Sequence, residues 1–139
     1  MDLIFAFALN NNDQFETCHF GDSKKFTIYH LEKGRIKPKL EVKNIYRSET
    51  HGDSKKGNSI IKCLKNHGAN VLVSRQFGQN ITMINKHFIP IIISTESPEE
   101  VIKILQKNLH WIQDEWNSST SDFKLFKIKS SILKLRIEE

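Results

Sequence analysis

The segment Cys18-His19-Phe20-Gly21 places two side chains that can bind a metal beside a glycine, soon after the first apolar run of the chain. Histidine offers a neutral imidazole and cysteine a soft thiolate, the ligands that transition metals and iron–sulfur clusters take in proteins. Gly21 lets the backbone bend or approach a ligand closely. Adjacent side chains of an extended segment point in opposite directions, so Cys18 and His19 can share a metal only if the chain turns between them. The alternatives are that His19 hydrogen-bonds its loop to a strand end and that Cys18 is buried.

Residues from other parts of the chain could complete such a site. His51 lies in a long polar segment that could close over a pocket, and the alternative is a mobile surface histidine. Arg75 and Gly78 follow an apolar strand candidate, where open α/β sheets place their ligands, and Arg75 could neutralise an anion there. Lys24 and Lys25 could do the same, with solvated surface as the alternative.

The remaining thiol and two further imidazoles have structural explanations. Cys63 falls on the apolar stripe of a predicted helix and is expected in the core. His67 and His110 are expected near helix C-termini, where a partly charged imidazole complements the helix dipole. Cys18 and Cys63 are the two cysteines of the chain, and we expect free thiols or ligands rather than a disulfide.

Motifs of known enzymes and of structural zinc sites are missing from the sequence. It contains no CxxC, HExxH, GxSxG or GxxxxGK[ST] pattern. A nuclease that works with two divalent ions would need acidic residues on its first strand, and the apolar run of residues 3–9 has none. We therefore expect a protein that is not an enzyme.

Strand patterns dominate the first half of the chain. Residues 3–9 are apolar at every position, which is typical of a strand covered on both faces. Residues 26–31 and 35–43 are expected to form a hairpin about Lys33-Gly34. The polar stretch 46–58 is expected to be a long connection, followed by a helix over 58–67 and a buried strand over 70–74.

The second half alternates helix and strand patterns. A short helix after Gly78 precedes a buried strand over 88–93, in which Pro90 predicts either a strand start or an edge position. Ser97-Pro98-Glu99-Glu100 predicts a capping box, and apolar residues from Val101 to Trp116 predict one long helix. Residues 124–129 and 132–137 favour a hairpin, with an amphipathic helix as the alternative. The predicted fold class is therefore a three-layer α/β domain over residues 1–117 with a mixed sheet, plus a C-terminal extension over 118–139.

Composition is that of an ordinary globular protein. The 139 residues suit one core, and 38% hydrophobic with 27% charged residues lies far from disordered or low-complexity chains. The first apolar run is too short for a membrane span and lacks a basic leader, so we expect a cytoplasmic protein. The net charge of +5 is spread along the chain, which favours a solvated basic surface over a nucleic-acid interface.

Four stretches of the chain resemble the dinitrogenase iron-molybdenum cofactor biosynthesis family over about residues 3–106. They are the opening apolar strand, HFG followed by FTIYHLEKGRI, then HGDSKKGNSIIKCLKNHGANVLV, and last FGQNITMINKHFIPIIISTESPEEVIKIL. This chain differs from relatives in the residues Arg75 to Phe77, which precede Gly78, and in about thirty added C-terminal residues.

The resemblance implies a ribonuclease-H-like fold with a five-stranded mixed sheet between helices. It also implies that His19 helps to hold an iron–sulfur or iron–molybdenum cluster. We expect reversible capture of such a precursor by His19, with Cys18 as a second candidate ligand, in a pocket bordered by Gly21, His51 and Gly78. The expected partners are proteins that donate or accept the cluster. Two alternatives stay open: an interaction module without cargo, which associates with partners or with itself through its C-terminal hairpin, and a weak nucleic-acid binder.

Overall fold

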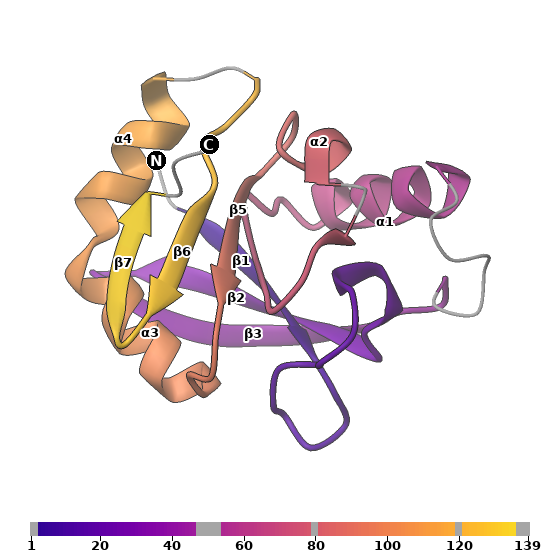
Figure 1. The fold of residues 1–139 in the computed structure, drawn as a ribbon, viewed down its shortest axis with the longest axis horizontal. Coiled ribbons are helices and arrows are strands. Elements are labelled where there is room, and N and C mark those ends of the chain that lie inside the picture. Colours follow the sequence, from indigo (N-terminus) through magenta and orange to yellow (C-terminus); the bar gives the residue numbers. More distant parts are fainter. Residues whose placement is uncertain (1–2, 47–53, 79–80, 119–120, 136–139) are drawn as a thin grey trace.

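The fold was analysed in a computed structural model that describes residues 3–46, 54–78, 81–118 and 121–135 (Figure 1). Within these ranges, seven strands form one sheet in the order β3-β2-β1-β4-β5-β6-β7. The strands are β1 (Ile4–Leu9), β2 (Lys25–Glu32), β3 (Arg35–Lys43), β4 (Val71–Ser74), β5 (Ile89–Ile93), β6 (Phe126–Lys129) and β7 (Ile132–Leu135). The helices are η1 (Phe20–Asp22, a 3₁₀ turn), α1 (Ser54–Asn66), α2 (Ile81–Ile84), α3 (Pro98–Lys107) and α4 (Leu109–Ser118).

The sheet is mixed, as the sequence predicts. Strands β1, β2 and β3 pair antiparallel, whereas β1, β4, β5 and β6 run parallel to one another. The C-terminal hairpin exists, but it does not stand apart from the sheet: β6 pairs with β5 and carries β7 at the edge. The sheet of the described chain therefore has seven strands rather than the expected five.

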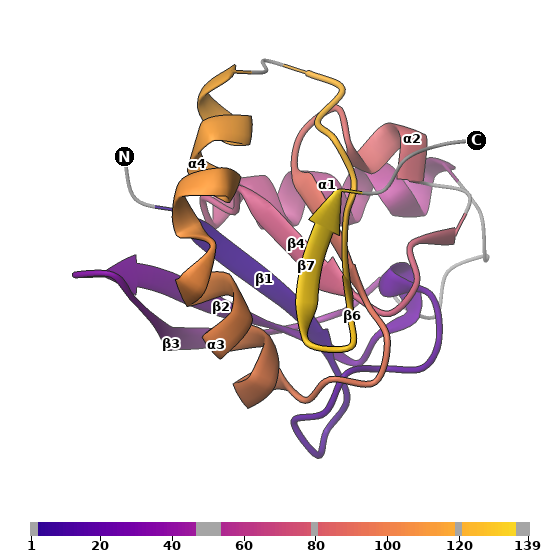
Figure 2. The same cartoon turned by 60° about the vertical axis from the view of Figure 1, so that its left-hand side comes forward.

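Strand β1 explains why a run without polar residues forms the centre of the sheet. Its side chains alternate between two separate cores: Phe5, Phe7 and Leu9 pack on the side of α3 and α4, and Ala6 and Ala8 pack on the side of α1. Figures 1 and 2 show these helices on opposite faces of the sheet. The prediction of a strand buried on both faces is confirmed.

Pro90 lies inside the sheet, in strand β5, and not at an edge. The amide of Ile89 donates to Asn70 on the β4 side, so the proline nitrogen faces the β6 side. Pairing with β6 begins only at Ile91, opposite Phe126. Pro90 therefore removes no hydrogen bond from the ladder, because it stands at the strand start, which is one of the two predicted positions.

The predicted long helix is divided in two. Its capping box at Ser97 and Glu100 is present, and α3 ends at Asn108. The Asn108 side chain donates to the carbonyl of Ile104 at 2.8 Å, so it competes with the helical backbone at this point. His110 consequently lies in the first turn of α4, and its predicted place near a helix C-terminus is wrong. None of the helices in the described ranges has both the length and the apolar character needed to cross a bilayer.

Glu96, which the sequence analysis did not single out, joins the C-terminal hairpin to the end of β5. Its buried carboxylate accepts hydrogen bonds from Ser94 and Thr95 at 3.0–3.2 Å, and from the amide of Ser131 in the β6–β7 turn at 3.4 Å. Burial alone would raise the pKa of this carboxyl, but the hydrogen bonds from its own backbone, Ser94 and Ser131 outweigh it and lower the pKa.

We expect Glu96→Gln to lower the free energy of unfolding by about 1–2 kcal/mol at pH 7, because one carboxylate oxygen becomes an amide that cannot accept. A lowered folded-state pKa gives stabilisation that is present above the ordinary glutamate pKa and is lost as the pH falls through the folded value. The difference between wild type and variant should therefore shrink in acid. Urea unfolding of both proteins at pH 7 and pH 3.5 measures this difference in the free energy of unfolding. A difference that does not depend on pH would contradict the lowered pKa of Glu96.

Candidate functional site

Two loops meet at the carboxyl ends of the parallel strands β1 and β4, in the middle of the sheet. The loop after β1 contains residues 17–23, and the loop after β4 contains residues 75–78. The amide of Phe20 donates to the carbonyl of Gln76 at 2.7 Å, and the Gln76 side chain donates to the carbonyl of Thr17 at 2.8 Å. The hydroxyl of Ser74 also donates to the Gln76 carbonyl, at 3.0 Å. These bonds join the loops at the edge where α/β sheets bind their ligands.

Phe20 anchors the first loop in the core. Its side chain is 4% exposed, and its ring lies 5.2 Å from that of Phe26 on β2 and 5.5 Å from that of Phe77 in the second loop. Aromatic pairs at this separation attract one another beyond the area that they bury. The middle residue of the HFG segment therefore fixes the backbone on which His19 stands.

The ring of His19 lies against the backbone of Gly78. A Cβ atom added at Gly78 would come within 2.9 Å of His19 Nδ1, which is closer than real Cβ contacts occur. Gly78 also has a φ of +69°, in the region that favours glycine. His19 itself is half-buried, so its imidazole is neither sealed in the core nor held out in solvent. The two loops thus hold this ring at the carboxyl ends of β1 and β4.

Helix α1 supports the same loop through a buried charge. Lys56 is 3% exposed, and its ammonium group pairs with the carboxylate of Asp22 in η1. The Lys56 stem also lies near Gly21, since a Cβ added there would be 3.7 Å from the lysine Cε and 3.6 Å from Ile60. From the other side, the buried Asn44 side chain donates to the carbonyl of Gly21 at 2.9 Å. Gly21 is therefore packed between α1 and the segment after β3.

A comparison with protein families finds a match over residues 1–108 to the family described as dinitrogenase iron-molybdenum cofactor. The chain belongs to this family. It includes proteins involved in the biosynthesis or binding of the iron–molybdenum cofactor, and the resemblance expected from the HFG segment is confirmed. The match covers the elements from β1 to α3, whereas α4, β6 and β7 lie beyond it. Among curated proteins, no match is found.

The structure brings together most of the residues that the sequence proposed for the family site. His19, Gly21 and Gly78 lie in the two joined loops, and Cys18 precedes His19 and is half-buried. Arg75 is half-buried directly after β4, at the same sheet edge. These placements describe geometry alone, and ligand binding by these residues stays a prediction.

Other predicted candidates do not join this group. His51 lies outside the described residues. Cys63, on α1, is half-buried rather than in the core, and burial raises the pKa of its thiol. Cys18 and Cys63 form no disulfide. Lys25 is engaged elsewhere, in ion pairs with Asp13 and Glu41.

Lys56 and Asp22 are not among the site residues predicted from the sequence. Residues 46–58 were predicted to be a long connection, whereas α1 begins at Ser54 and Lys56 is buried. The Lys-Lys pair at 55 and 56 looks the same whether its members are exposed or buried. An earlier helix start would have placed Lys56 four residues before Ile60, on the apolar face of the helix.

We expect Gly78→Ala to lower the free energy of unfolding by about 1–2 kcal/mol, because alanine is strained at positive φ and its methyl group would displace the His19 ring. Unfolding measurements and the NMR signals of the His19 imidazole together check this. Gly21→Ala is the matched control: its methyl group would meet only ordinary contacts, so a change within about 0.5 kcal/mol is expected. Equal effects of the two substitutions would contradict the close approach at Gly78.

Proposed function

We propose that this protein is a non-catalytic carrier that reversibly holds an iron–sulfur or iron–molybdenum cofactor precursor as its cargo. His19 is the ligand in this proposal, with Cys18 as a second ligand. The observation that carries it is the position of the His19 ring, held against Gly78 by two loops at the carboxyl edge of β1 and β4. Family membership supplies the class of cargo.

Few ligands suit a protein that must release what it binds. Among the described residues, no group of three or more His, Cys, Asp or Glu side chains could hold a metal ion. A neutral imidazole with one thiolate gives fewer protein ligands than a permanently bound cluster takes, which favours transfer to an acceptor. Arg75 at the same edge would neutralise part of the negative charge of such a cargo.

The proposal extends to the finer features that the resemblance implies. They are a ribonuclease-H-like arrangement of β1 to β5, a cytoplasmic location, and partners that donate or accept the cluster. Gly21 and Gly78 would border the pocket.

Anaerobic reconstitution of the full chain with iron and sulfide tests the proposal. Visible absorption and bound iron should show a coloured wild type, and His19→Ala should lower the bound iron by about tenfold or more. His67→Ala is the control, because this exposed histidine lies past the opposite end of α1, and a helix of 13 residues is about 20 Å long. Equal loading of the His19 and His67 variants would overturn the role of His19.

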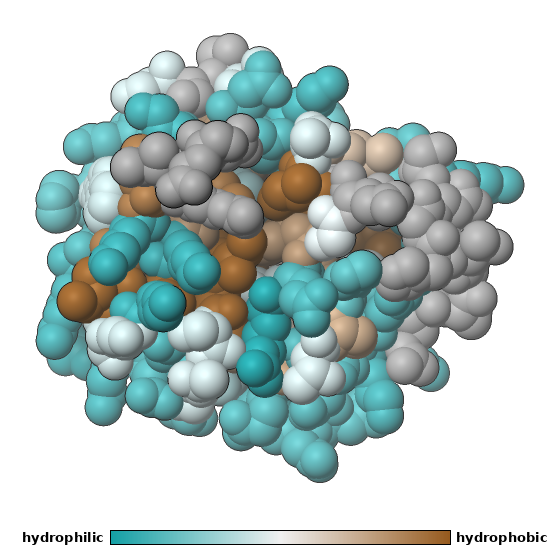
Figure 3. All heavy atoms as spheres, in the orientation of Figure 1, coloured by the Kyte–Doolittle hydropathy of each residue, from teal (hydrophilic) through white to brown (hydrophobic). Residues whose placement is uncertain are grey.

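A colourless wild type would favour the second candidate function, an interaction module without cargo. The observation behind it is the edge strand β7, where Ile132 is 54% exposed. In the view of Figure 3, apolar surface is visible over the part of the sheet that contains β5 and β6, with hydrophilic surface around it. Unpaired strand edges of this kind accept a further strand.

A further inference from the structure

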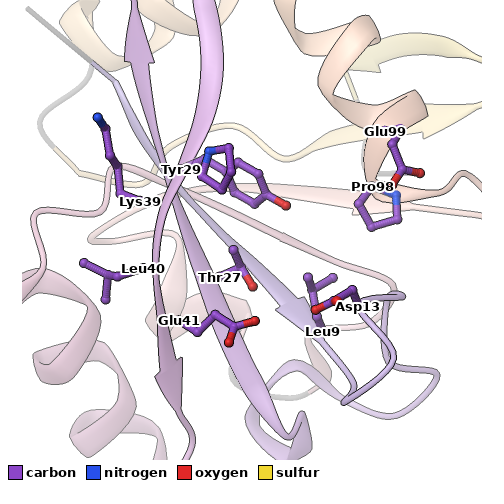
Figure 4. A pocket seen from close by; sticks show the side chains of 10 residues that line it. Leu9, Asp13, Thr27, Tyr29, Lys39, Leu40, Glu41, Pro98 and Glu99 are labelled. Atoms are coloured by element: carbon purple, nitrogen blue, oxygen red, sulfur yellow. The ribbon is translucent and has the colours of Figure 1, made fainter.

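A hollow of about 390 Å³ opens on the face of the sheet opposite Phe20. It lies between β2, β3, the loop after β1 and the first turn of α3 (Figure 4). Leu9 and Tyr29 supply apolar surface to it, and both belong to the core on the α3 side. This volume lies within the range of small-molecule sites.

Thr27 on β2 lines the hollow with a hydroxyl group that is not satisfied by the protein. The residue is 6% exposed, and its buried Oγ1 has no hydrogen-bond partner in the structure. Nearly all buried polar side-chain atoms in proteins are hydrogen-bonded, because leaving one unpaired costs free energy. The unpaired hydroxyl of Thr27 therefore points to a ligand in the hollow that supplies the missing bond.

The rim of the hollow carries more negative than positive charge. Asp13, Glu41 and Glu99 line it with three carboxylates from three different elements. Lys25 pairs with Asp13 and Glu41, and its ammonium group is the positive charge that balances part of this cluster. Glu99 on α3 adds a further carboxylate across the hollow. The rim is therefore acidic although the chain as a whole has a net charge of +5.

Lys39 also lines the hollow, but its charge is directed elsewhere. Its ammonium group pairs with Glu32 at 2.5 Å, and Figure 4 shows this end pointing away from the other lining side chains. The pKa of the Tyr29 hydroxyl is consistent with a negative electrostatic potential in the hollow. Burial raises this pKa most, and the negative charges of Asp13 and Glu99 raise it further. The hollow therefore favours cations over anions.

The spacing of the carboxylates distinguishes among cations. No group of three His, Cys, Asp or Glu side chains in the described ranges could hold a metal ion, and that includes the three rim carboxylates. A metal ion needs its ligands within about 2.6 Å, whereas an organic ammonium group can sit between separated carboxylates. An ammonium group has three donors and no acceptor, which matches the carboxylates and the hydroxyls of Thr27 and Tyr29.

We infer that this hollow is a binding site for a small aliphatic diamine or polyamine. Its ammonium groups bind the rim carboxylates and the hydroxyl of Thr27, and its methylene chain packs against Leu9 and the ring of Tyr29. The site uses none of residues 17–23 or 75–78 around His19, so the inference does not depend on the proposed cluster carrier. A failed iron reconstitution would leave it standing.

Calorimetric titration of the full chain with 1,4-diaminobutane tests this inference. The wild type should bind the diamine and should not bind valerate, which has a similar apolar chain and the opposite charge. Thr27→Val and Glu99→Gln should each weaken diamine binding at least about fivefold. Asp114→Asn is the matched control, because this exposed carboxylate on α4 does not line the hollow.

Thermal unfolding of each variant separates binding from folding. Thr27→Val removes an unpaired buried hydroxyl, so its melting temperature should equal or exceed that of the wild type while its diamine affinity falls. No diamine binding by the wild type would overturn the inference. Equal weakening by Asp114→Asn and Glu99→Gln would also overturn it, because it would indicate general attraction to surface charge.

Discussion

Asp22→Asn is expected to lower the free energy of unfolding by about 3 kcal/mol. The substitution removes the negative charge that balances the Lys56 ammonium, and the Lys56 side chain is only 4% exposed. A buried charge that loses its countercharge is costly, whereas the charge pair itself contributes little net stability. Chemical denaturation at pH 7, followed by circular dichroism, gives the value.

Lys56→Met makes this prediction sharper. Methionine fills the buried space of the lysine stem, and the Asp22 side chain, which is 24% exposed, is partly hydrated. We therefore expect a smaller loss, of about 1 kcal/mol. The double variant should recover most of the loss caused by Asp22→Asn alone, because it contains no buried charge. Lys62→Met, at an exposed position of the same helix, is the control, with a change within about 0.5 kcal/mol.

Similar losses from Asp22→Asn and Lys56→Met would contradict the expected difference between the two members of the pair. A loss below about 1 kcal/mol for Asp22→Asn would show that Lys56 keeps its hydration in the folded protein. In that second case, the link between α1 and η1 would depend on the apolar cluster that contains Phe20 and Ile60.

Periodicity and turn chemistry predicted the elements that depend on local sequence. An uninterrupted apolar run predicted the central strand β1, and the capping box at Ser97 predicted the start of α3. The hairpin of β2 and β3 follows from Lys33-Gly34, where both residues have positive φ. Each of these features is decided by interactions within a few residues, which a single sequence displays directly.

Features that depend on contacts between distant segments were not predictable. The break at Asn108 is a local exception, because it results from one side-chain hydrogen bond to Ile104 that leaves the apolar stripe of the sequence continuous. Strand β6 pairs with β5 but has only four residues. A strand this short does not show in the sequence which strand it will pair with.

The candidate site shows the same limit. His19 and the HFG segment were recognisable by residue type, and Gly78 by its place after a strand. Their contact depends on the packing of Phe20 with Phe77 and on the bond from Phe20 to Gln76, which no local pattern displays. Lys56 was missed because a lysine in a polar segment is ordinarily exposed.

Phe20→Ala should lower the free energy of unfolding by about 3–5 kcal/mol, because it empties a buried ring position between Phe26 and Phe77. Phe20→Leu, which refills part of this space, should lose about 1–2 kcal/mol. Denaturant titration of both variants gives these values. Losses of equal size would indicate that the ring position collapses around the smaller side chain.

Phe20 and His19 should therefore separate stability from binding. His19→Ala removes a half-buried imidazole and should change the free energy of unfolding by less than about 1 kcal/mol while bound iron falls. Phe20→Leu keeps the imidazole, and its iron loading should remain within a few-fold of wild type under conditions where the protein is folded. If Phe20→Leu instead lost iron as completely as His19→Ala, the loop backbone rather than the imidazole would hold the cargo. Because the amide of Phe20 is committed to the Gln76 carbonyl, the geometry favours the imidazole.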